Sequence, residues 1–447
     1  MPARDFRTLL AALDARGELV RADSSVRAAS DIAAATAYNA APFNVQNRPV
    51  LFNAIEGSAF RAAANMFSTH DRLAFALNVE MLDEIRLRLN NLFDLNIPRG
   101  SMGLMERMGD LIEAARSIGI AANTAPKQPA AQAVVSRHPL DARVFPAFRY
   151  AAGETHPSFT AAVLIFNDQA GTRHIRATRA VLIDADTLAV QVEANDRVLI
   201  DERAPYPAAV ILGADPALLW SAGVPLPGGF DRAMLAAWIR GKPVPFVHAV
   251  SIALEIPADA EVIFEGALMA YQPPSRVTWC ENDGGLHDHD LIAFSLSAIT
   301  HREKAIIPIL APNGADAYWM RRATERLFLP LLKAVLPGID DFHHISDQVG
   351  IAAVSPLYLN PERAHRVMAG LWGMIPGLDA VVVVPAHLDI HDLEMLMRNL
   401  HGMCATTITG IGFTAVLVTP PASESMPACD AAHVIAELLK MPVAEEG

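Results

Sequence analysis

The first part of the chain has the hydrophobic spacing of amphipathic helices. Residues 5–19, DFRTLLAALDARGEL, place four apolar side chains on one helical face, between Asp5 as the expected N-cap and Gly17 as the expected end. The same kind of pattern predicts three further elements, a strand at 50–52 and helices at 71–95 and 100–129.

The pattern changes to short, β-rich runs in the middle of the chain. These runs lie at 161–166, 180–183, 189–192, 208–212, 246–254, 262–264 and 294–300. Strands at such close spacing, joined by turn residues, predict a barrel or folded sheet and not repeated βαβ units. One helical interlude, at 215–222 and 232–240, flanks the turn 224–229, VPLPGG.

The last third alternates buried strands with helices. Strands are expected at 306–310 and 380–384, and helices at 321–334, 361–371, 393–400 and 431–441. Together with the linker TAPKQPAAQ and the change of pattern near residue 305, this divides the chain into 1–128, 129–305 and 306–447. The predicted fold class is mixed α/β (α+β), with α/β organisation on both sides of a β-rich middle domain.

Length and composition agree with a large globular protein. The chain has 447 residues, 52% of them hydrophobic, enough for two or three domains with substantial cores. It contains no uncharged apolar stretch of about 18 residues, and its amphipathic start lacks a signal-peptide pattern. The net charge of -13 disfavours nucleic acid, and three widely spaced cysteines suit a reducing compartment. We therefore expect a soluble, cytoplasmic protein without membrane or nucleic-acid partners.

Ionisable side chains are concentrated between residues 276 and 290. They are Arg276, Glu281, Asp283, His287, Asp288, His289 and Asp290. A folded chain buries such a group only if its members are paired, bind a metal or line a cleft, and the alternative is a solvated loop. His287 and His289 would share a face of a strand, as metal ligands can, but for this run we favour the loop.

Four segments, in their order and spacing, resemble one enzyme family. They are 5–21 (DFRTLLAALDARGELVR), 209–227 (AVILGADPALLWSAGVPLP), 254–266 (LEIPADAEVIFEG) and 298–302 (AITHR). The chain resembles UbiD-type decarboxylases, which use prenylated FMN to decarboxylate acrylic and aromatic acids reversibly. The resemblance implies an N-terminal α/β domain, a central split β-barrel that binds the flavin, and a C-terminal α/β domain used for oligomer contacts.

The resemblance also assigns catalytic roles. Arg179 matches the family's catalytic arginine, which could hold a substrate carboxylate bidentately; the alternative is an arginine in a surface salt bridge. Glu281 matches the second glutamate of the family's EGPxGE motif and would move the proton at the substrate carbon. Arg276 stands where the family has the first glutamate, and it could recognise a second substrate carboxylate.

The cofactor and metal positions depart from the family. The implied metal ligands, for Mn²⁺ or Mg²⁺ with K⁺ as a further candidate, are His174, Asn195 and Asp231. Arg232 occupies the family's metal-binding glutamate position, where a positive charge would repel a cation and attract phosphate. The other expected cofactor contacts, besides His174, Asn195, Arg179 and Arg232, are Ala177, Thr178, Val224 and Pro225.

Two functions follow from the resemblance. The first is prenylated-FMN-dependent decarboxylation of an aromatic or heteroaromatic acid, with a dicarboxylate such as furan dicarboxylate suggested by Arg276. The second is a flavin-free paralogue that serves as a structural or regulatory subunit of a decarboxylase or carboxylase, because so many ligand positions have changed. The implied partners are a flavin prenyltransferase that supplies the cofactor and identical subunits in a homodimer or homohexamer.

Overall fold

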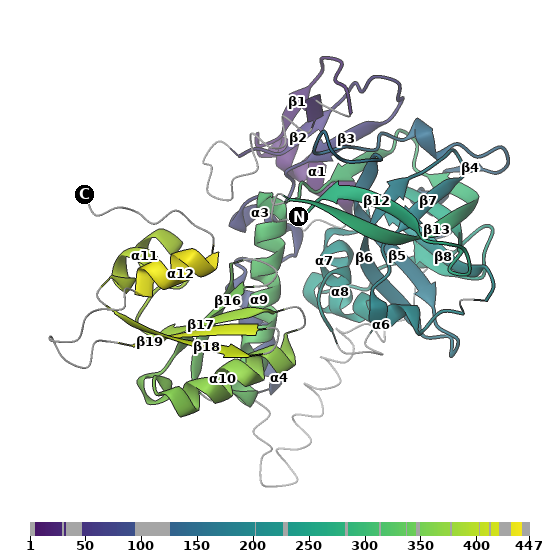
Figure 1. The fold of residues 1–447 in the computed structure, drawn as a ribbon. Coiled ribbons are helices and arrows are strands. Elements are labelled where there is room, and N and C mark those ends of the chain that lie inside the picture. The colour runs from purple at the N-terminus through teal and green to yellow at the C-terminus, as the bar shows by residue number, and fades with distance from the viewer. Residues whose placement is uncertain are drawn as a thin grey trace, which may run out of the picture. The chain divides into compact units, whose positions relative to one another are not determined.

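The structure is a computed structural model (Figure 1). It describes residues 5–28, 31–32, 47–93, 126–201, 203–226, 231–281, 285–312, 314–336, 338–345, 349–375, 378–401, 403–410, 413–419 and 431–439. The chain forms two compact units, one of residues 1–84 and 94–320 and the other of residues 85–93 and 321–447. The predicted domain boundaries near 128 and 305 stay predictions, since these units divide the chain differently.

The N-terminal part of the first unit is a helix with a small mixed sheet. Helix α1 (Phe6–Ala15) has the predicted N-cap Asp5, which forms a capping box with Thr8. The sheet has the order β1-β2-β3-β14. Its strands are β1 (Val20–Ala22), β2 (Val50–Phe52), β3 (Arg61–Ala64) and β14 (Ile306–Ile309). Because β14 pairs in parallel with β3, the chain returns to this sheet after the middle domain.

The helix expected over 71–95 is two helices, α3 (His70–Ala76) and α4 (Asp83–Phe93). The prediction of one helix is wrong because Asn78 has a φ of 60°, a left-handed conformation that ends a helix. The helix expected at 100–129 falls largely on residues outside those that the structure describes.

The middle of the chain is a closed, six-stranded antiparallel barrel, as the spacing of the β-rich runs predicted. Its strands follow the order β11-β8-β5-β6-β7-β13, and β13 pairs again with β11. They are β5 (Ser158–Asn167), β6 (Arg173–Leu182), β7 (Thr187–Val190), β8 (Tyr206–Leu212), β11 (Val262–Leu268) and β13 (Leu286–His301). Alternate residues such as Phe166, Val210 and Phe264 fill one continuous core.

Short elements surround the barrel. They are η2 (Ala130–Gln132), β4 (Val134–Ser136), η3 (Ala142–Val144), α6 (Ala194–Arg197), α7 (Pro216–Ala222), α8 (Arg232–Arg240), β9 (Phe246–His248), β10 (Glu255–Pro257) and β12 (Ser275–Cys280). The side chains of Asp215 and Asp231 cap α7 and α8, where the first backbone N–H groups lack helical partners.

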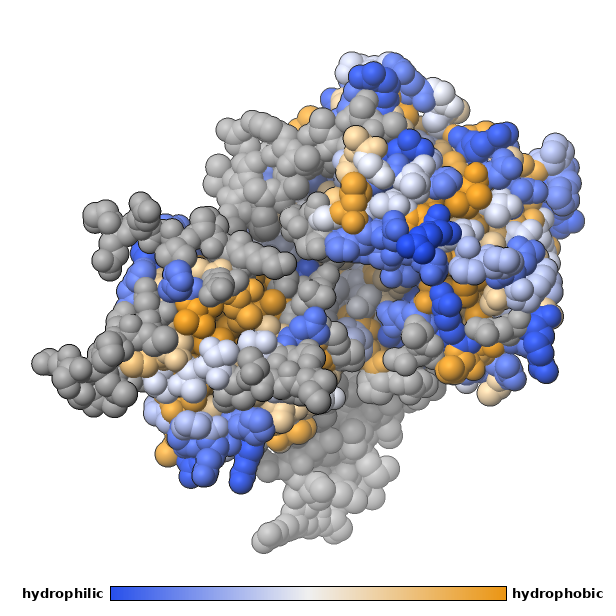
Figure 2. Space-filling view, in the orientation of Figure 1, coloured by the Kyte–Doolittle hydropathy of each residue, from blue (hydrophilic) through white to orange (hydrophobic). Residues whose placement is uncertain are grey.

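Residues 286–290 form a strand, which corrects the predicted loop for the HDHD run. They begin β13, which pairs with β12 as an antiparallel hairpin, with His289 opposite Val277. The sequence was misleading because Asp288 and Asp290 lie on an exposed strand face, where charges need no burial. Hydrophilic surface covers this hairpin in Figure 2. Among the described residues, no helix has the length and apolar character needed to cross a membrane.

The C-terminal unit is an α/β layer structure, as predicted for this part of the chain. Its sheet has the order β15-β16-β17-β19-β18. The strands are β15 (Ile339–His344), β16 (Val349–Val354), β17 (Ala380–Pro385), β18 (Cys404–Gly410) and β19 (Phe413–Thr419). The helices are α9 (Ala315–Val335), η4 (Pro356–Tyr358), α10 (Pro361–Met374), α11 (Leu393–Leu400) and α12 (Ala431–Leu439). Along β17, Val381 and Val383 pack with α10, whereas Val382 and Val384 pack with α11 and α12, so both faces are covered.

Candidate functional site

Arg179, the predicted catalytic arginine, lies on β6 in the barrel and is almost completely buried. Its Nη2 donates to Oε1 of Glu154 at 2.8 Å, and its Nε donates to Oγ of Ser158 at 2.8 Å. Its Nη1 donates to the backbone carbonyl oxygen of Cys280 at 3.0 Å. Arg179 is therefore an internal, charge-paired arginine, and the alternative of a surface salt bridge is wrong.

Glu154 is the fully buried counter-ion of Arg179. Its carboxylate also accepts the backbone N–H of Cys280 at 2.9 Å and that of Tyr150 at 2.8 Å. The ion pair of Glu154 and Arg179 thus holds both backbone polar groups of Cys280, the residue before Glu281. A buried ion pair that binds both backbone polar groups of one residue fixes the backbone at the end of β12.

Glu281 lies directly after β12, and its side chain is about a third exposed. Its Oε1 accepts the indole N–H of Trp279 at 2.8 Å and lies 3.0 Å from Nε2 of His289. The imidazole of His289 stacks on the indole of Trp279, with ring centroids 3.9 Å apart. Burial is the main cause that lowers the pKa of His289, so its ring is neutral near pH 7.

Arg179 and Glu281 come together around Trp279. The Cζ atom of Arg179 lies over the Trp279 ring, 4.9 Å from its centroid, while Glu281 accepts the indole N–H of the same residue. A fixed cation and a carboxylate in contact with solvent can act on one ligand, the first by binding an anionic group and the second by moving a proton.

Arg276 lies away from this pair. Its guanidinium is largely exposed and pairs with Asp288 across the hairpin at 3.0 Å. Arg276 and Glu281 are five positions apart, and strand alternation places such positions on opposite faces. The structure thus brings Arg179 and Glu281 together without Arg276.

A small cavity lies at β6 and the residues that follow β7. The cavity has a volume of about 70 Å³ and is lined by Leu164, Arg176, Ala177, Gln191, Val192, Glu193 and Asp196. Thr178 donates to the carbonyl oxygen of Gln191 at 2.9 Å, which ties β6 to the residue after β7. Of the expected contacts, Ala177 lines the cavity, and Thr178 is the next residue on the same strand.

The turn after α7 carries Val224 and Pro225. Val224 is buried, Pro225 is exposed, and the carbonyl oxygen of Val224 accepts a hydrogen bond from Arg232 at 3.0 Å. A Cβ built on Gly223 would lie 3.7 Å from that of Ala177, which places this turn against the cavity wall.

The proposed metal ligands already have protein partners. His174 has Asp168 at 3.0 Å from Nε2 and Arg176 at 3.3 Å from Nδ1, and its ring stacks on Phe166. Asp231 accepts from Arg173 at 2.6 Å and from the backbone N–H that it caps. The side chain of Asn195 lies outside the described part of the structure.

Sequence reasoning missed Glu154 and the two arginines of β6, Arg173 and Arg176. Glu154 precedes its partners by 25 and 126 positions, so no local pattern connects them. The alternation of His174 and Arg176 along one strand was the available signal for a charged strand face.

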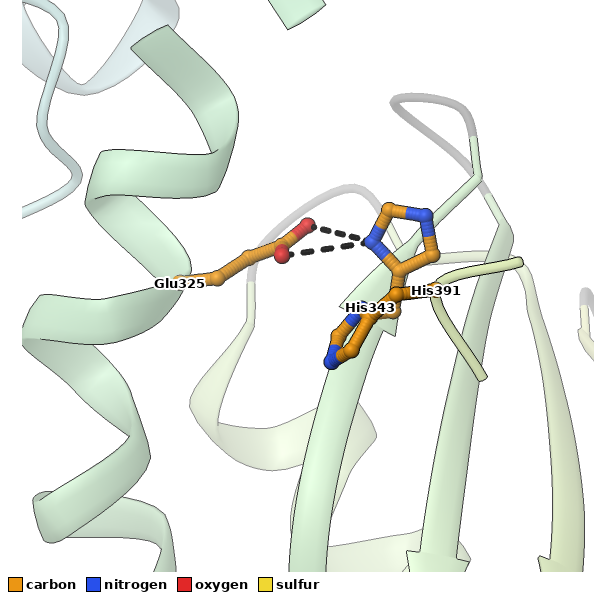
Figure 3. A group of neighbouring side chains, drawn as sticks. All are labelled: Glu325, His343 and His391. Carbon is orange, nitrogen blue, oxygen red and sulfur yellow. Dashed lines mark hydrogen bonds and ion pairs between the residues drawn. The ribbon is translucent and has the colours of Figure 1, made fainter. Parts of the chain in front are cut away.

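A second polar cluster lies in the C-terminal unit. Glu325 on α9 points toward His343 on β15 and His391 after β17, and one ligand atom from each lies within 4.8 Å of the others (Figure 3). Nη1 of Arg322 lies 2.6 Å from both Oε2 of Glu325 and Nδ1 of His391. Arg322 therefore supplies the positive charge for Glu325 and His391. The cluster links helix α9 to the sheet with balanced charges.

Comparisons with known proteins agree with this architecture. Three family models, all described as 3-octaprenyl-4-hydroxybenzoate carboxy-lyase, match the chain. Their N-terminal domain matches residues 10–89, their Rift-related domain 123–315 and their C-terminal domain 318–405. An uncharacterized protein of Archaeoglobus fulgidus is 27% identical over 88% of this chain and 83% of its own length.

Solved structures with the same fold cover nearly the whole chain. An evolved dimeric form of the UbiD-class enzyme HmfF from Pelotomaculum thermopropionicum, in complex with prFMN, aligns with a TM-score of 0.78. It is 18% identical and covers 99% of this chain and 100% of its own. Vanillic acid decarboxylase from Sedimentibacter hydroxybenzoicus, in its closed form, gives 0.73 at 19% identity and 98% of both chains.

Proposed function

The chain belongs to the UbiD family of carboxy-lyases, and on that premise we propose that it decarboxylates an aromatic or heteroaromatic acid with prenylated FMN. The observation that carries the proposal is the meeting of Arg179 and Glu281 around Trp279. One of these groups is a fixed cation for a carboxylate, and the other is a carboxyl group in contact with solvent. Decarboxylation requires both functions on one substrate.

In this proposal, Arg179 binds the substrate carboxylate. Its three described hydrogen bonds use one N–H on each of its three nitrogens, which leaves one N–H on each Nη of the five that a guanidinium carries. Two such N–H groups match the two oxygens of a carboxylate. Glu154 holds the guanidinium in place and keeps it charged.

In this proposal, Glu281 transfers the proton. Loss of CO₂ leaves an electron pair on the ring carbon, and prenylated FMN, when bound, supplies the electron sink for that charge. Protonated Glu281 donates its proton to this carbon and then regains one from solvent, because its side chain is partly exposed. In the carboxylation direction, the same carboxylate removes the ring proton.

The proposed activity is tested after coexpression with a flavin prenyltransferase. Wild type should show a flavin spectrum and release CO₂ from members of a panel of aromatic acids. Glu281→Gln should keep the spectrum and lose at least about 100-fold in turnover, the usual size of a general acid's contribution. Arg276→Gln is the matched control, since Arg276 lies on the opposite, exposed strand face. A colourless protein, inactive on every acid, would support the flavin-free paralogue instead.

Preference for a dicarboxylate is a separate proposal that rests on Arg276. The pair of Arg276 and Asp288 on the exposed face of the hairpin gives it no support, so we propose a monocarboxylate as the main substrate. Rates with furan monocarboxylate and dicarboxylate, in wild type and Arg276→Glu, decide between the two. A wild-type preference for the diacid that Arg276→Glu abolishes would overturn our choice.

A further inference from the structure

The metal that the family resemblance implies does not fit the described residues. Arg176 contacts His174, and Arg173 contacts Asp231, so each of these two expected ligands lies beside a guanidinium. The third side chain at this place is Arg232, another cation. A divalent ion would have to displace Arg176 from His174 and Arg173 from Asp231, and it would also face Arg232, which costs free energy.

Arg232 has the features of an anion-binding residue. It is the first residue of α8, only 6% of its surface is exposed, and its Nη2 donates to the carbonyl oxygen of Val224. Its buried Nε has no hydrogen-bond partner, and no carboxylate pairs with its guanidinium, among the residues that the structure describes. A buried, unpaired cation is stabilised by a bound anion.

The cavity beside Arg232 has the size for the head of such an anion. Arg232 binds the carbonyl oxygen of Val224, and the turn that carries Val224 packs at Gly223 against Ala177, one of the residues that line the cavity. Its volume of about 70 Å³ holds on the order of five water molecules, which suits a phosphate group and not a three-ring system.

The two acidic residues that line the cavity do not neutralise Arg232, so its positive charge is available to bind an anion. Both carboxylate oxygens of Asp196 bind Arg176, so this pair is neutral as a unit. Glu193 is exposed, where solvent screens its charge. The N-terminal end of α8 adds a partial positive charge next to Arg232.

We propose that Arg232, and not a divalent metal, holds the phosphate group of the flavin in this chain. The inference rests on the proposed function, because it supposes that the chain binds a flavin mononucleotide. It assigns Arg232 as the phosphate ligand and the cavity at β6 and β7 as the phosphate site, and it makes cofactor binding independent of Mn²⁺ and Mg²⁺.

FMN and riboflavin, which differ only by the phosphate, are the probes that test this. We expect the full chain to bind FMN, measured by quenching of flavin fluorescence, with the same Kd in EDTA as in Mn²⁺. Arg232→Gln should weaken FMN at least about tenfold, as for the loss of a hydrogen bond to a charged group, and leave riboflavin unchanged. Arg203→Gln, which removes an exposed arginine paired with Asp201, is the matched control and should bind like wild type.

The outcomes separate this inference from the proposed function. Wild type that binds FMN only with Mn²⁺ and releases it in EDTA would overturn the role of Arg232 while the decarboxylase proposal stands. An Arg232→Gln variant that folds and keeps full FMN affinity would overturn it as well. Wild type without affinity for FMN under any condition would refute the proposed function itself. If Arg232→Gln does not fold, the comparison of EDTA with Mn²⁺ in wild type still decides, and Arg232→Lys provides a second variant.

Discussion

Replacing Glu154 by glutamine should destabilise the barrel and disturb the site together. One carboxylate oxygen of Glu154 accepts Arg179 and the Cys280 N–H, and the other accepts the Tyr150 N–H. A glutamine has one acceptor oxygen and one NH₂ group. In either orientation, its NH₂ therefore faces a donor, and Arg179 loses its counter-ion.

The size of the expected loss of stability follows from the burial of Glu154 and Arg179. The side chain of Glu154 is fully buried and that of Arg179 is 9% exposed, so water cannot replace the lost partner. Breaking one side of a buried ion pair costs about 3–5 kcal/mol. The pair of Arg276 and Asp288 is exposed and screened by solvent, so its loss should have little effect on stability, which makes Asp288→Asn the matched control.

Thermal unfolding, followed by the fluorescence of the tryptophans, measures the difference. For the unit of residues 1–84 and 94–320 we expect Glu154→Gln to lower the Tm by roughly 5–8 °C, and Asp288→Asn by roughly 2 °C or less. Glu154→Gln should also lose decarboxylase activity at temperatures where it remains folded, because Cys280 no longer positions Glu281. Equal Tm values for the two variants would refute the reasoning that the buried pair holds the site.

Three further changes test other parts of the structure. Burial raises the pKa of Asp316 to about 7, so the stability linked to its protonated form is lost as pH rises from about 4 to 7. Asp316→Asn should therefore raise the free energy of unfolding at pH 8 by on the order of 2–4 kcal/mol, measured by urea unfolding. Burial opposes the charge of Glu325, but the hydrogen bond from His343 and the charges of His343, Arg322 and His344 together outweigh it and lower the pKa of Glu325 to about 2. Wild type should therefore lose stability as pH falls from about 4 to 2, and Glu325→Gln should flatten that part of the profile. A Cβ on Gly266 would lie 2.0 Å from the backbone oxygen of Ser295, so Gly266→Ala should lower the free energy of unfolding by about 3 kcal/mol or prevent folding. Gly223→Ala is the control, because a Cβ there has room, and it should behave like wild type.

The strands of the barrel could be predicted because the apolar character of their residues follows directly from their burial. Residues 161–166 and 208–212 are apolar throughout, since both faces of β5 and β8 are covered, and this signal does not depend on distant residues. The predicted closed barrel in a mixed α/β chain is thus confirmed. The HDHD run was misassigned because its partner β12, and not its own composition, makes it a strand.

The candidate site could be predicted only in part. The family resemblance selected Arg179 and Glu281, and their proximity around Trp279 is consistent with the predicted roles, which stay predictions. Glu154 could not be found, because a buried counter-ion is defined by the fold that brings it to Arg179 and not by its neighbours in sequence. Roles for Asn195, Val224 and Pro225 likewise stay predictions.

The length of β13 limits how this chain can diversify. Its sixteen residues form part of the barrel wall and also one side of the hairpin that carries Trp279 and Glu281. Inserting or deleting one residue along it would turn every later side chain to the other face, and the barrel would no longer close around its core. New substrate preferences in relatives of this chain should therefore arise by exchange of side chains on this strand, while changes of length accumulate in the connections elsewhere.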